Sequence, residues 1–318
     1  MPATQERPIA LFHEHPDWFR PLFSALERRG TPFVRIAAAQ HGYDPGEAPP
    51  YSLVFNRMSP SAYLRGAGNA IFYTQSWLDH LERSGVRVVN GRAAYGVETS
   101  KAVQINLLRH LGLPYPRTRV INHASQAPAA AEGLRFPIAV KPNIGGSGAG
   151  VRRFDTPQAL AAAAAEGFDL GVDSVALVQE FVPAEEGRIT RVEVLGGKFL
   201  YGIRIYTTGD TFDLCPADVC QRVDGAELVR AACPVDAPKN RLRVEGYTPP
   251  DEIIAQVERI MAEANIEVGG IEYFVDSRDG KHYFYDVNAL SNFVADAPRV
   301  VGFDPFERLA DYLIAEAR

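Results

Sequence analysis

Apolar runs and amphipathic segments alternate along the first third of the chain. Short strands are expected at residues 9–12, 33–36, 52–56 and 86–90, with helices at residues 16–29 and 76–84. Strands that alternate with helices at this spacing are typical of a parallel sheet covered by its helices. Residues 1–96 are therefore predicted to form an N-terminal α/β domain. No segment of this domain has the pattern of a phosphate-binding loop.

From residue 97 onward the pattern changes to helices separated by hairpins. Residues 98–111 are expected to form a helix that Gly112 ends, and Gly196-Gly197 separates two long alternating runs, a strong hairpin signal. Two later strands are expected to meet at a turn around Asp279-Gly280. Strands are expected at residues 119–121, 136–141, 151–154, 176–181, 189–195, 198–206, 270–276 and 282–287, and further helices at 127–133, 156–166, 252–264 and 305–317.

The composition argues against several classes of protein. The chain has 318 residues, 46% of them hydrophobic, and a formal net charge of −6, enough for two or three packed domains. Mild acidity without a basic stripe argues against a nucleic-acid partner. No run approaches the ~18 apolar residues of a membrane-spanning helix, and residues 1–11 are too polar for a signal peptide. Three cysteines, an odd number, suit a reducing compartment, so a cytoplasmic protein with no membrane partner is expected.

A glycine-rich segment after the strand at 136–141 is the first candidate for ligand binding. Glycines let backbone N–H groups approach phosphate oxygens closely, and a lysine on the preceding strand would add a point charge. No Gly-Lys-Ser/Thr ends the segment, so it is not a Walker A loop, and Val151 replaces the third glycine of a Rossmann fingerprint. A flexible turn is the alternative. The residues concerned are Lys141, Gly145, Gly146, Ser147, Gly148 and Gly150.

Acidic residues on the last two expected strands are the second candidate. Asp286 and Asn288 lie two residues apart and so share one face of a strand, while Glu272 lies on the strand before. Carboxylate and amide oxygens suit Mg²⁺, and carboxylates on otherwise apolar strands are costly to bury without a cation. Glu272, Asp286 and Asn288 are therefore candidate magnesium ligands, with a solvated edge strand as the alternative.

Single segments give weaker signals. An apolar strand ends in Gln179, Glu180, Phe181 and Val182, which could present backbone groups to an adenine ring, although a core strand explains it equally well. Lys101 is unremarkable by itself, because most helix lysines are solvated.

The cysteines and paired histidines carry no clear metal signal. Cys215, Cys220 and Cys233 lack a fourth zinc ligand nearby and are interpreted as structural thiols, with a substrate loop or a metal site as alternatives. His13 and His15 follow the first strand, where a surface loop is the favoured interpretation and a substrate contact the alternative.

Taken in order, these segments resemble the ATP-grasp superfamily, and most closely its RimK-like carboxylate–amine ligases. The resemblance covers residues 97–318 and implies an α+β ATP-grasp fold, with a lid subdomain at about 115–182 and a catalytic subdomain at about 183–318 that clasp ATP. The N-terminal part is similar to the α/β domain that usually precedes this fold. The matching residues are Ser100-Lys101, segment 136–151, residues 178–182, Arg191, Gly270-Ile271-Glu272, Asp286-Val287-Asn288 and Gly302-Phe303-Asp304.

The resemblance also implies a chemistry. Such ligases transfer the γ-phosphate of ATP to a carboxylate, and an amine then displaces phosphate from the acyl-phosphate. Lys101 and Lys141 would contact the ATP phosphates beneath the mobile loop 145–150, and residues 179–182 would meet adenine. Small-molecule carboxylate and amine substrates, amino acids or peptides, are implied, and a homodimer is a further implication. Glu272, Asp286 and Asn288 would bind magnesium, and Mn²⁺ could substitute for that ion.

Two departures bear on the substrate. Ile189 stands where RimK-like ligases carry an acidic residue two positions before Arg191, so ribose contact falls to Glu185 or Glu186. After the central hairpin, RimK-like ligases carry a basic segment, whereas this chain has an apolar and acidic stretch. Arg204 therefore becomes the candidate cation at the γ-phosphate or acyl-phosphate. Arg191 and Arg204 are thus the candidate catalytic residues, and glutamate becomes a doubtful substrate.

The sequence therefore predicts an ATP- and Mg-dependent ligase that activates a carboxylate for attack by an amine. A small-molecule kinase of the same fold and a non-catalytic nucleotide-binding regulatory protein are the alternatives. A kinase would form ADP without an amine, and a regulatory protein would bind ATP without turnover. The intact lysine and metal-ligand positions argue against the regulatory protein.

Overall fold

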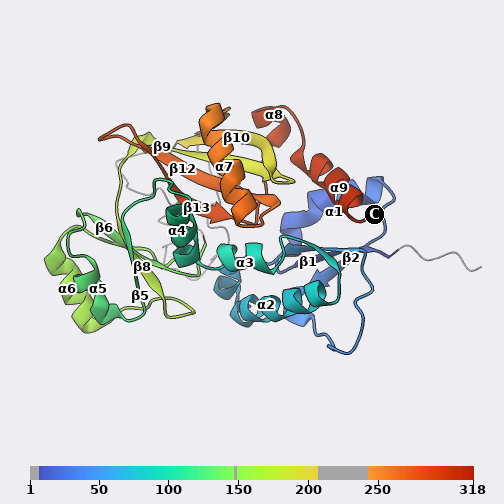
Figure 1. Cartoon of the computed structure of the whole chain (residues 1–318), viewed down its shortest axis with the longest axis horizontal. Helices are drawn as coiled ribbons and strands as arrows, with labels where there is room; N and C mark the ends of the chain where they lie inside the picture. The colour runs from blue at the N-terminus through green and yellow to red at the C-terminus, as the bar shows by residue number, and fades with distance from the viewer. Residues whose placement is uncertain (1–6, 147–148, 207–242) are drawn as a thin grey trace, which may run out of the picture.

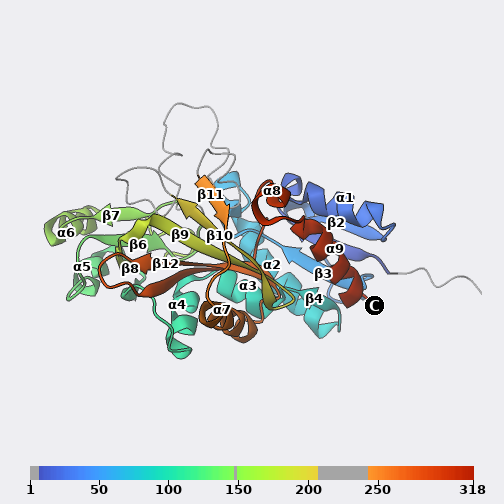
Figure 2. The same cartoon turned by 90° about the horizontal axis from the view of Figure 1, so that it is seen from above.

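The strands form three separate sheets, each with helices of its own (Figure 1). The computed structural model describes residues 7–146, 149–206 and 243–318. The N-terminal sheet lies at one end of the molecule and the sheet of β5 to β8 at the other. The long strands β9, β10, β12 and β13 lie between them (Figures 1 and 2).

The first sheet is parallel throughout, in the order β2–β1–β3–β4. Alternate residues of its central strands belong to different cores: Leu11 packs in the cluster that includes α1, and Phe12 in the cluster that includes α2. Helices therefore cover both faces, which confirms the expected N-terminal α/β arrangement. The elements are β1 (Ile9–His13), η1 (Pro16–Phe19), α1 (Arg20–Arg28), β2 (Phe33–Ala37), η2 (Ala38–Gln40), β3 (Leu53–Arg57), η3 (Pro60–Arg65), α2 (Gly68–Arg83), β4 (Arg87–Val89) and α3 (Arg92–Glu98).

The second sheet is antiparallel, in the order β5–β8–β6–β7. It has a core of its own, in which Ile138 and Val178 of the sheet pack with Leu160 of α6. The elements are β5 (Thr118–Ile121), η4 (Ala124–Gln126), α5 (Ala127–Ala130), β6 (Ile138–Pro142), β7 (Arg152–Phe154), α6 (Pro157–Glu166) and β8 (Ala176–Glu180).

The third sheet is antiparallel, in the order β11–β10–β9–β12–β13. Gly196 and Gly197 both have positive φ, 60° and 72°, as a two-residue hairpin turn requires, and they join β9 to β10. This hairpin and the pairing of β12 with β13 confirm the two expected hairpins. The elements are α4 (Lys101–His110), β9 (Ala184–Leu195), β10 (Lys198–Tyr206), β11 (Arg243–Gly246), α7 (Asp251–Glu263), β12 (Val268–Asp276), β13 (His282–Asn288), α8 (Ala297–Val301) and α9 (Pro305–Glu316).

The first and third sheets share one hydrophobic core. Phe55 of β3, Ile203 of β10 and Leu313 of α9 belong to the same buried cluster. Helix α9 lies beside α1 in Figures 1 and 2, and Arg29 Nη1 lies 2.6 Å from Glu307 Oε2 across that contact. The second sheet has its separate core, as its predicted role as a lid would need. The domain boundaries near residues 96, 115 and 182 stay predictions.

Several local expectations were wrong in detail. The helix expected at 98–111 is α4, which begins only at Lys101, because Ser100 adopts an extended conformation and caps it by accepting a hydrogen bond from the Val103 N–H. Helix α3, just before it, was not expected. Helix α2 begins at Gly68, well before the expected residue 76. Neither α8 nor β11 was expected, since both are short. None of the helices in the described ranges is long and apolar enough to cross a lipid bilayer.

Candidate active site

An ion pair joins the first residue of α4 to strand β13. The Ser100 cap fixes the start of the helix, and Lys101 Nζ lies 2.9 Å from Asp286 Oδ1. Both side chains are 23% exposed, so the pair can be approached from solvent. A cation and a carboxylate that sequence analysis assigned to the phosphates and the metal are therefore neighbours.

Glu272 lies directly across from Asp286 in the β12–β13 ladder. Its Oε1 accepts a hydrogen bond from Arg191 Nη1 at 2.9 Å, and its Oε2 accepts one from the Tyr285 hydroxyl. The register shifts just beyond this pair, where Tyr273 lies opposite Phe284, so Tyr285 forms a bulge. Bulges re-aim side chains beside functional sites, and this one directs the Tyr285 hydroxyl at Glu272.

The two carboxylates have opposite electrostatic settings. Burial raises the pKa of Glu272 above its ordinary value, and the charge of Asp286 adds to this, although Arg191 and Tyr285 oppose it. Burial would also raise the pKa of Asp286, but the charge and hydrogen bond of Lys101 outweigh it and hold that pKa below its usual value. Two adjacent carboxylates, one strongly desolvated, form a site that a further cation would stabilise.

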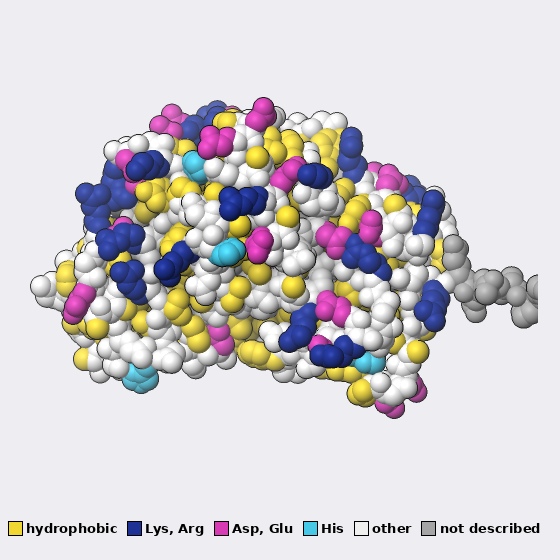
Figure 3. All heavy atoms as spheres, in the orientation of Figure 1, with side chains coloured by type: hydrophobic (Ala, Val, Ile, Leu, Met, Phe, Trp, Pro, Cys, Tyr) yellow, Lys and Arg dark blue, Asp and Glu magenta, His cyan; other side chains and the backbone are white. Residues whose placement is uncertain are grey.

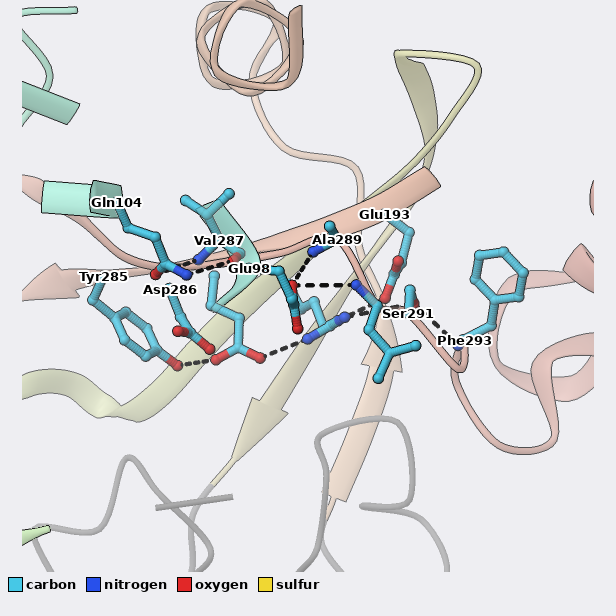
Figure 4. A network of polar contacts seen from close by, with 12 residues as sticks. Glu98, Gln104, Glu193, Tyr285, Asp286, Val287, Ala289, Ser291 and Phe293 are labelled. Carbon is cyan, nitrogen blue, oxygen red and sulfur yellow. Dashed lines mark hydrogen bonds and ion pairs between the residues drawn. The ribbon is translucent and has the colours of Figure 1, made fainter. Parts of the chain in front are cut away.

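Arg191 organises the buried side of this site. Its side chain is 2% exposed, and its Nε lies 2.6 Å from Glu193 Oε1, while Nη1 reaches Glu272. Gly270 provides the space, because a Cβ on that residue would lie 2.7 to 2.9 Å from the guanidinium atoms. Figure 4 shows this network, with Tyr285 and Asp286 at one end and Glu193 and Ser291 at the other.

The donor set fits a hard divalent cation. Glu272, Asp286 and Asn288 all lie where β12 pairs with β13, and Asn288 is close enough to Asp286 to lower its pKa. Among the described residues no group of three or more His, Cys, Asp or Glu side chains could hold a metal ion. The candidate donor set is two carboxylates and one amide. That set suits Mg²⁺, which takes few protein oxygens and completes its shell with phosphates and water.

Lys141 of β6 faces the same strand from the second sheet. Its Nζ lies 6.0 Å from the centre of the Tyr285 ring, and the Tyr285 hydroxyl binds Glu272. Tyr285 therefore spans the distance between the lysine-bearing strand and the carboxylate pair. The start of the glycine loop packs against the N-terminal part of the chain: a Cβ on Gly146 would lie 3.2 Å from the Ser61 Cβ. Gly145 lies near the Tyr63 hydroxyl, whereas Ser147 and Gly148 lie outside the described residues.

Asn143 ties the two lysine-bearing elements together, and sequence analysis gave it no role. Its Oδ1 accepts hydrogen bonds from Ser100 Oγ at 3.1 Å and from the Ala102 N–H at 2.9 Å, and its carbonyl oxygen accepts from the Lys101 N–H. Its Nδ2 donates to Asp173 Oδ2 at 2.7 Å. One side chain on the loop after Lys141 thus holds the first turn of the helix that carries Lys101.

Residues at the end of β8 and just after it are largely committed to local contacts. Gln179 donates to Thr118 Oγ1 at 2.8 Å, and Glu180 accepts from the Arg135 N–H at 2.9 Å. The Phe181 ring lies 5.5 Å from the Arg153 guanidinium, and Val182 is buried in the core shared by the first and third sheets. Contact with adenine would fall to backbone groups of this segment, and it stays a prediction.

The candidate ribose and phosphate contacts lie on β9 and β10. Glu185 and Glu186 are exposed and lie 2.8 and 2.9 Å from the Arg188 guanidinium, and Glu186 has a positive φ of 54°. Arg204 stacks on the Tyr247 ring at 3.5 Å, and its buried Nε makes no hydrogen bond within the described part of the chain. The roles of these residues stay predictions.

Polar residues of the N-terminal part hold the backbone that follows β13. Asn90 Nδ2 donates to the carbonyl oxygens of Val268, at 2.6 Å, and Ala289, at 2.5 Å. Glu98 accepts hydrogen bonds from the N–H groups of Ala289 and Leu290 (Figure 4), and burial raises its pKa to about 7 against these hydrogen bonds. Sequence analysis missed both residues, because nothing local distinguishes them from other polar residues near the end of an element.

Gln104 on α4 was also missed, although its position was a usable signal. It lies beside the apolar residues of the buried helix face, and it bonds to both the N–H and the carbonyl oxygen of Val287. The edge strand between Asp286 and Asn288 is thereby held by a side chain. A polar residue on an apolar helix face indicates such a role.

The histidine interpretation was wrong for His13. This residue ends β1 and is 3% exposed, so it is not on a surface loop. Neither ring nitrogen has a hydrogen-bond partner in the described ranges, and burial lowers its pKa. The three cysteines lie outside the described residues, so their interpretation stays a prediction.

Two curated proteins resemble the chain over part of their length. It is 29% identical over 163 residues to a probable alpha-L-glutamate ligase of Teredinibacter turnerae, a match that covers 51% of this chain and 51% of that protein. It is 27% identical over 216 residues to a D-alanine–D-alanine ligase of Ectopseudomonas mendocina, covering 65% of this chain and 61% of that protein. The chain thus spans about half to three-fifths of the length of these relatives. No protein-family model matches it.

Solved structures match nearly the whole chain. A RimK domain protein ATP-grasp from Sphaerobacter thermophilus superposes with a TM-score of 0.67 at 20% identity, covering 96% of this chain and 98% of that one. The ATP-grasp ligase PsnB, solved with a phosphomimetic variant of its minimal precursor, Mg and ADP, gives 0.66 at 19% identity, covering 99% and 100%. At these identities the matches establish a common fold.

Proposed function

We propose that this chain, which has the ATP-grasp fold, is an ATP-dependent ligase that joins a carboxylate to an amine. The resemblance to ligases described above supports this reaction class, but the activity rests on the site. The observation that carries the proposal is that Lys141 lies on one side of the Tyr285 ring, while the hydroxyl of that ring binds Glu272.

Positioning and charge are what phosphoryl transfer requires most of a protein. The triphosphate would lie between the lysines, Lys101 and Lys141, and the carboxylates, Glu272 and Asp286. The lysine ammonium groups would neutralise phosphate oxygens. When ATP binds, Lys101 would exchange part of its interaction with Asp286 for one with phosphate.

A magnesium ion held by Glu272, Asp286 and Asn288 would supply charge neutralisation for the β- and γ-phosphates. Mn²⁺ would substitute for it. Arg191 would keep the buried Glu272 ionised and oriented, since its guanidinium lowers the pKa that burial raises. The metal site would thus be built on a carboxylate that is already fixed by two partners.

The reaction would proceed in two displacements. A substrate carboxylate oxygen attacks the γ-phosphorus and ADP leaves. An amine then attacks the acyl carbon, phosphate leaves, and the amine loses a proton to solvent or to a base. Arg204 is the proposed cation for the acyl-phosphate, because its unsatisfied Nε and aromatic support make it a ready donor. Covering of the site by residues 145–150 would exclude water, which would otherwise hydrolyse the intermediate.

Amino acids or peptides are the proposed substrates, the backbone of residues 179–182 would receive adenine, and Glu185 or Glu186 would contact the ribose. A cytoplasmic location and a homodimer are part of the proposal.

Phosphate release tests the proposal directly. The wild-type chain is incubated with ATP, MgCl₂ and pairs of small carboxylates and amino acids, with mass spectrometry of the products. Phosphate release that needs both a carboxylate and an amine is expected, together with an amide product. ADP formation without an amine would identify a kinase instead.

Variants separate the site from the scaffold. Lys141→Ala and Asp286→Ala are expected to abolish turnover while the melting temperature changes little, and Asp286→Ala should also weaken Mn²⁺ binding measured by electron paramagnetic resonance. Lys281→Ala is the matched control, because that lysine is exposed and lies 3.9 Å from Asp279 on the far turn. Wild-type turnover in both site variants would refute the proposed site.

A further inference from the structure

Arg57 is a buried cation at the boundary between the first and third sheets. It is the last residue of β3, and its Nη2 donates to the carbonyl oxygen of Ser291 and, at 3.0 Å, to Asn292 Oδ1. Its Cζ lies 4.7 Å from the centre of the Phe19 ring and 5.1 Å from that of Phe55. The side chain is 2% exposed, so two rings and two oxygens hold it in one orientation.

Two donor atoms of this guanidinium are unused. Nε and Nη1 are buried and have no hydrogen-bond partner within the described residues. Arginine offers five N–H donors, and a buried donor without an acceptor costs roughly 1–3 kcal/mol. Such groups are uncommon in folded proteins unless a ligand satisfies them.

Arg57 also differs from its neighbour Arg191. Arg191 contacts two carboxylates, Glu193 and Glu272, whereas no described carboxylate is in ion-pair contact with Arg57. Burial lowers the pKa of Arg57 to about 9; the distant charges of Glu98 and Glu193 raise it, and that of Arg191 lowers it further. The guanidinium therefore stays charged near neutral pH, in a buried setting where an anion in direct contact would stabilise it.

We infer that Arg57 binds a carboxylate of the substrate, one that does not react, through its unused N–H donors. This inference rests on the proposed function, since it names a group on that enzyme's substrate. A carboxylate fits better than a phosphate, because a single guanidinium matches a single charge and Arg191 is already paired.

The location explains why this carboxylate is not the reacting one. A reacting carboxylate must reach the γ-phosphate, between the lysines and the β12–β13 carboxylates. Arg57 instead contacts Ser291 and Asn292, which follow the metal-ligand position Asn288 along the chain. The substrate is therefore an amino acid that reacts through its amine, or a dicarboxylic acid that reacts through its other carboxylate. In both cases the carboxylate held at Arg57 does not react.

The test compares Arg57→Gln and Arg57→Lys with wild type and with Arg35→Gln. Arg35 is the matched control, because it also lies over aromatic rings of the N-terminal part, 4.0 Å from the centre of the Phe23 ring on α1, but its side chain is 50% exposed. Calorimetry first measures the affinity of each protein for Mg–AMPPNP. This affinity should be the same in the wild type and in all variants.

Melting temperatures are then measured with the L-amino acids and with dicarboxylic acids of three to six carbons, each paired with its carboxamide. At least one acid should stabilise the wild type and Arg35→Gln, while its carboxamide should bind about 10- to 100-fold more weakly, as expected for a lost charge-assisted hydrogen bond. Arg57→Gln should lose this preference, and Arg57→Lys should keep part of it.

The outcomes separate the two proposals. If no acid is preferred over its carboxamide, or if Arg57→Gln keeps the wild-type preference, the inference about Arg57 is wrong, whatever the nucleotide result. If the wild type does not bind Mg–AMPPNP, that result counts instead against the proposed function. Should Arg57→Gln fail to fold, Arg57→Lys decides, because it keeps the charge and loses the planar donors. A preference in Arg57→Lys as large as that of the wild type would then overturn the inference.

Discussion

Lys101 and Asp286 are ion-paired at 2.9 Å, although 185 residues separate them along the chain. The pair places the start of α4 against β13, and both side chains are partly exposed rather than sealed in the core. The face of the molecule in Figure 3 carries acidic and basic side chains interspersed.

Lys101→Ala should lower kcat/KM for ATP about 10- to 100-fold, because a hydrogen bond to a charged group contributes roughly 1.5–3 kcal/mol. The pH profile should also shift. Without the ammonium, burial would raise the pKa of Asp286, so activity should be lost at a higher pH as the solution is acidified. Lys198→Ala, which breaks an exposed pair with Glu258, is the control and should leave both measurements unchanged. An unaltered profile in Lys101→Ala would contradict this account.

Gly270→Ala should destabilise the protein by about 1–3 kcal/mol, as overpacking does in a filled core. The added Cβ would lie within 2.9 Å of the Arg191 guanidinium, which must move away from Glu272. Chemical denaturation measures the loss, and turnover should fall with it. Gly96→Ala is the control: nothing lies within 4 Å of its Cβ position inside α3, so that change should be neutral or stabilising. Equal stability of the two variants would mean that Arg191 is not confined by Gly270.

Glu98 should make stability depend on pH. Burial raises its folded pKa from 4.5 to about 7, so the folded state holds more protons than the unfolded state between these values. Stability should therefore fall as pH rises through this window, by up to roughly 3 kcal/mol. Glu98→Gln keeps an acceptor for the Ala289 and Leu290 N–H groups, and its denaturation curves should depend less on pH between 4.5 and 7. Parallel curves for variant and wild type would rule out this contribution.

Asn143→Ala should impair both lysine-bearing elements at once. It removes acceptors for Ser100 and Ala102 and the donor to Asp173, so a stability loss of about 1–3 kcal/mol is expected. KM for ATP should rise by about tenfold as Lys101 loses its fixed position. Asn122→Ala, an exposed position in the bend that follows β5, is the control. A change in stability without a change in KM would limit Asn143 to a structural role.

Local sequence patterns were sufficient for the elements that depend on neighbours in the chain. The Gly196-Gly197 turn was visible because only glycine readily takes two successive positive φ angles. Alternation along β13 correctly placed Asp286 and Asn288 on one face, because side chains alternate in any strand. Helix α3 was missed, because its seven residues are too few to show a clear apolar period.

The site depended on contacts that no local pattern contains. Arg191 meets Glu272 across 81 residues, and Asn90 meets Ala289 across 199. Sequence alone indicated which residues had the chemistry for phosphate and metal, because carboxylates on apolar strands and a lysine before glycines are unusual wherever they occur. Only the tertiary structure decided that Glu98, Asn143 and Arg57 surround these candidate residues. Burial makes a polar side chain costly until it is paired, and burial is a property of the whole fold.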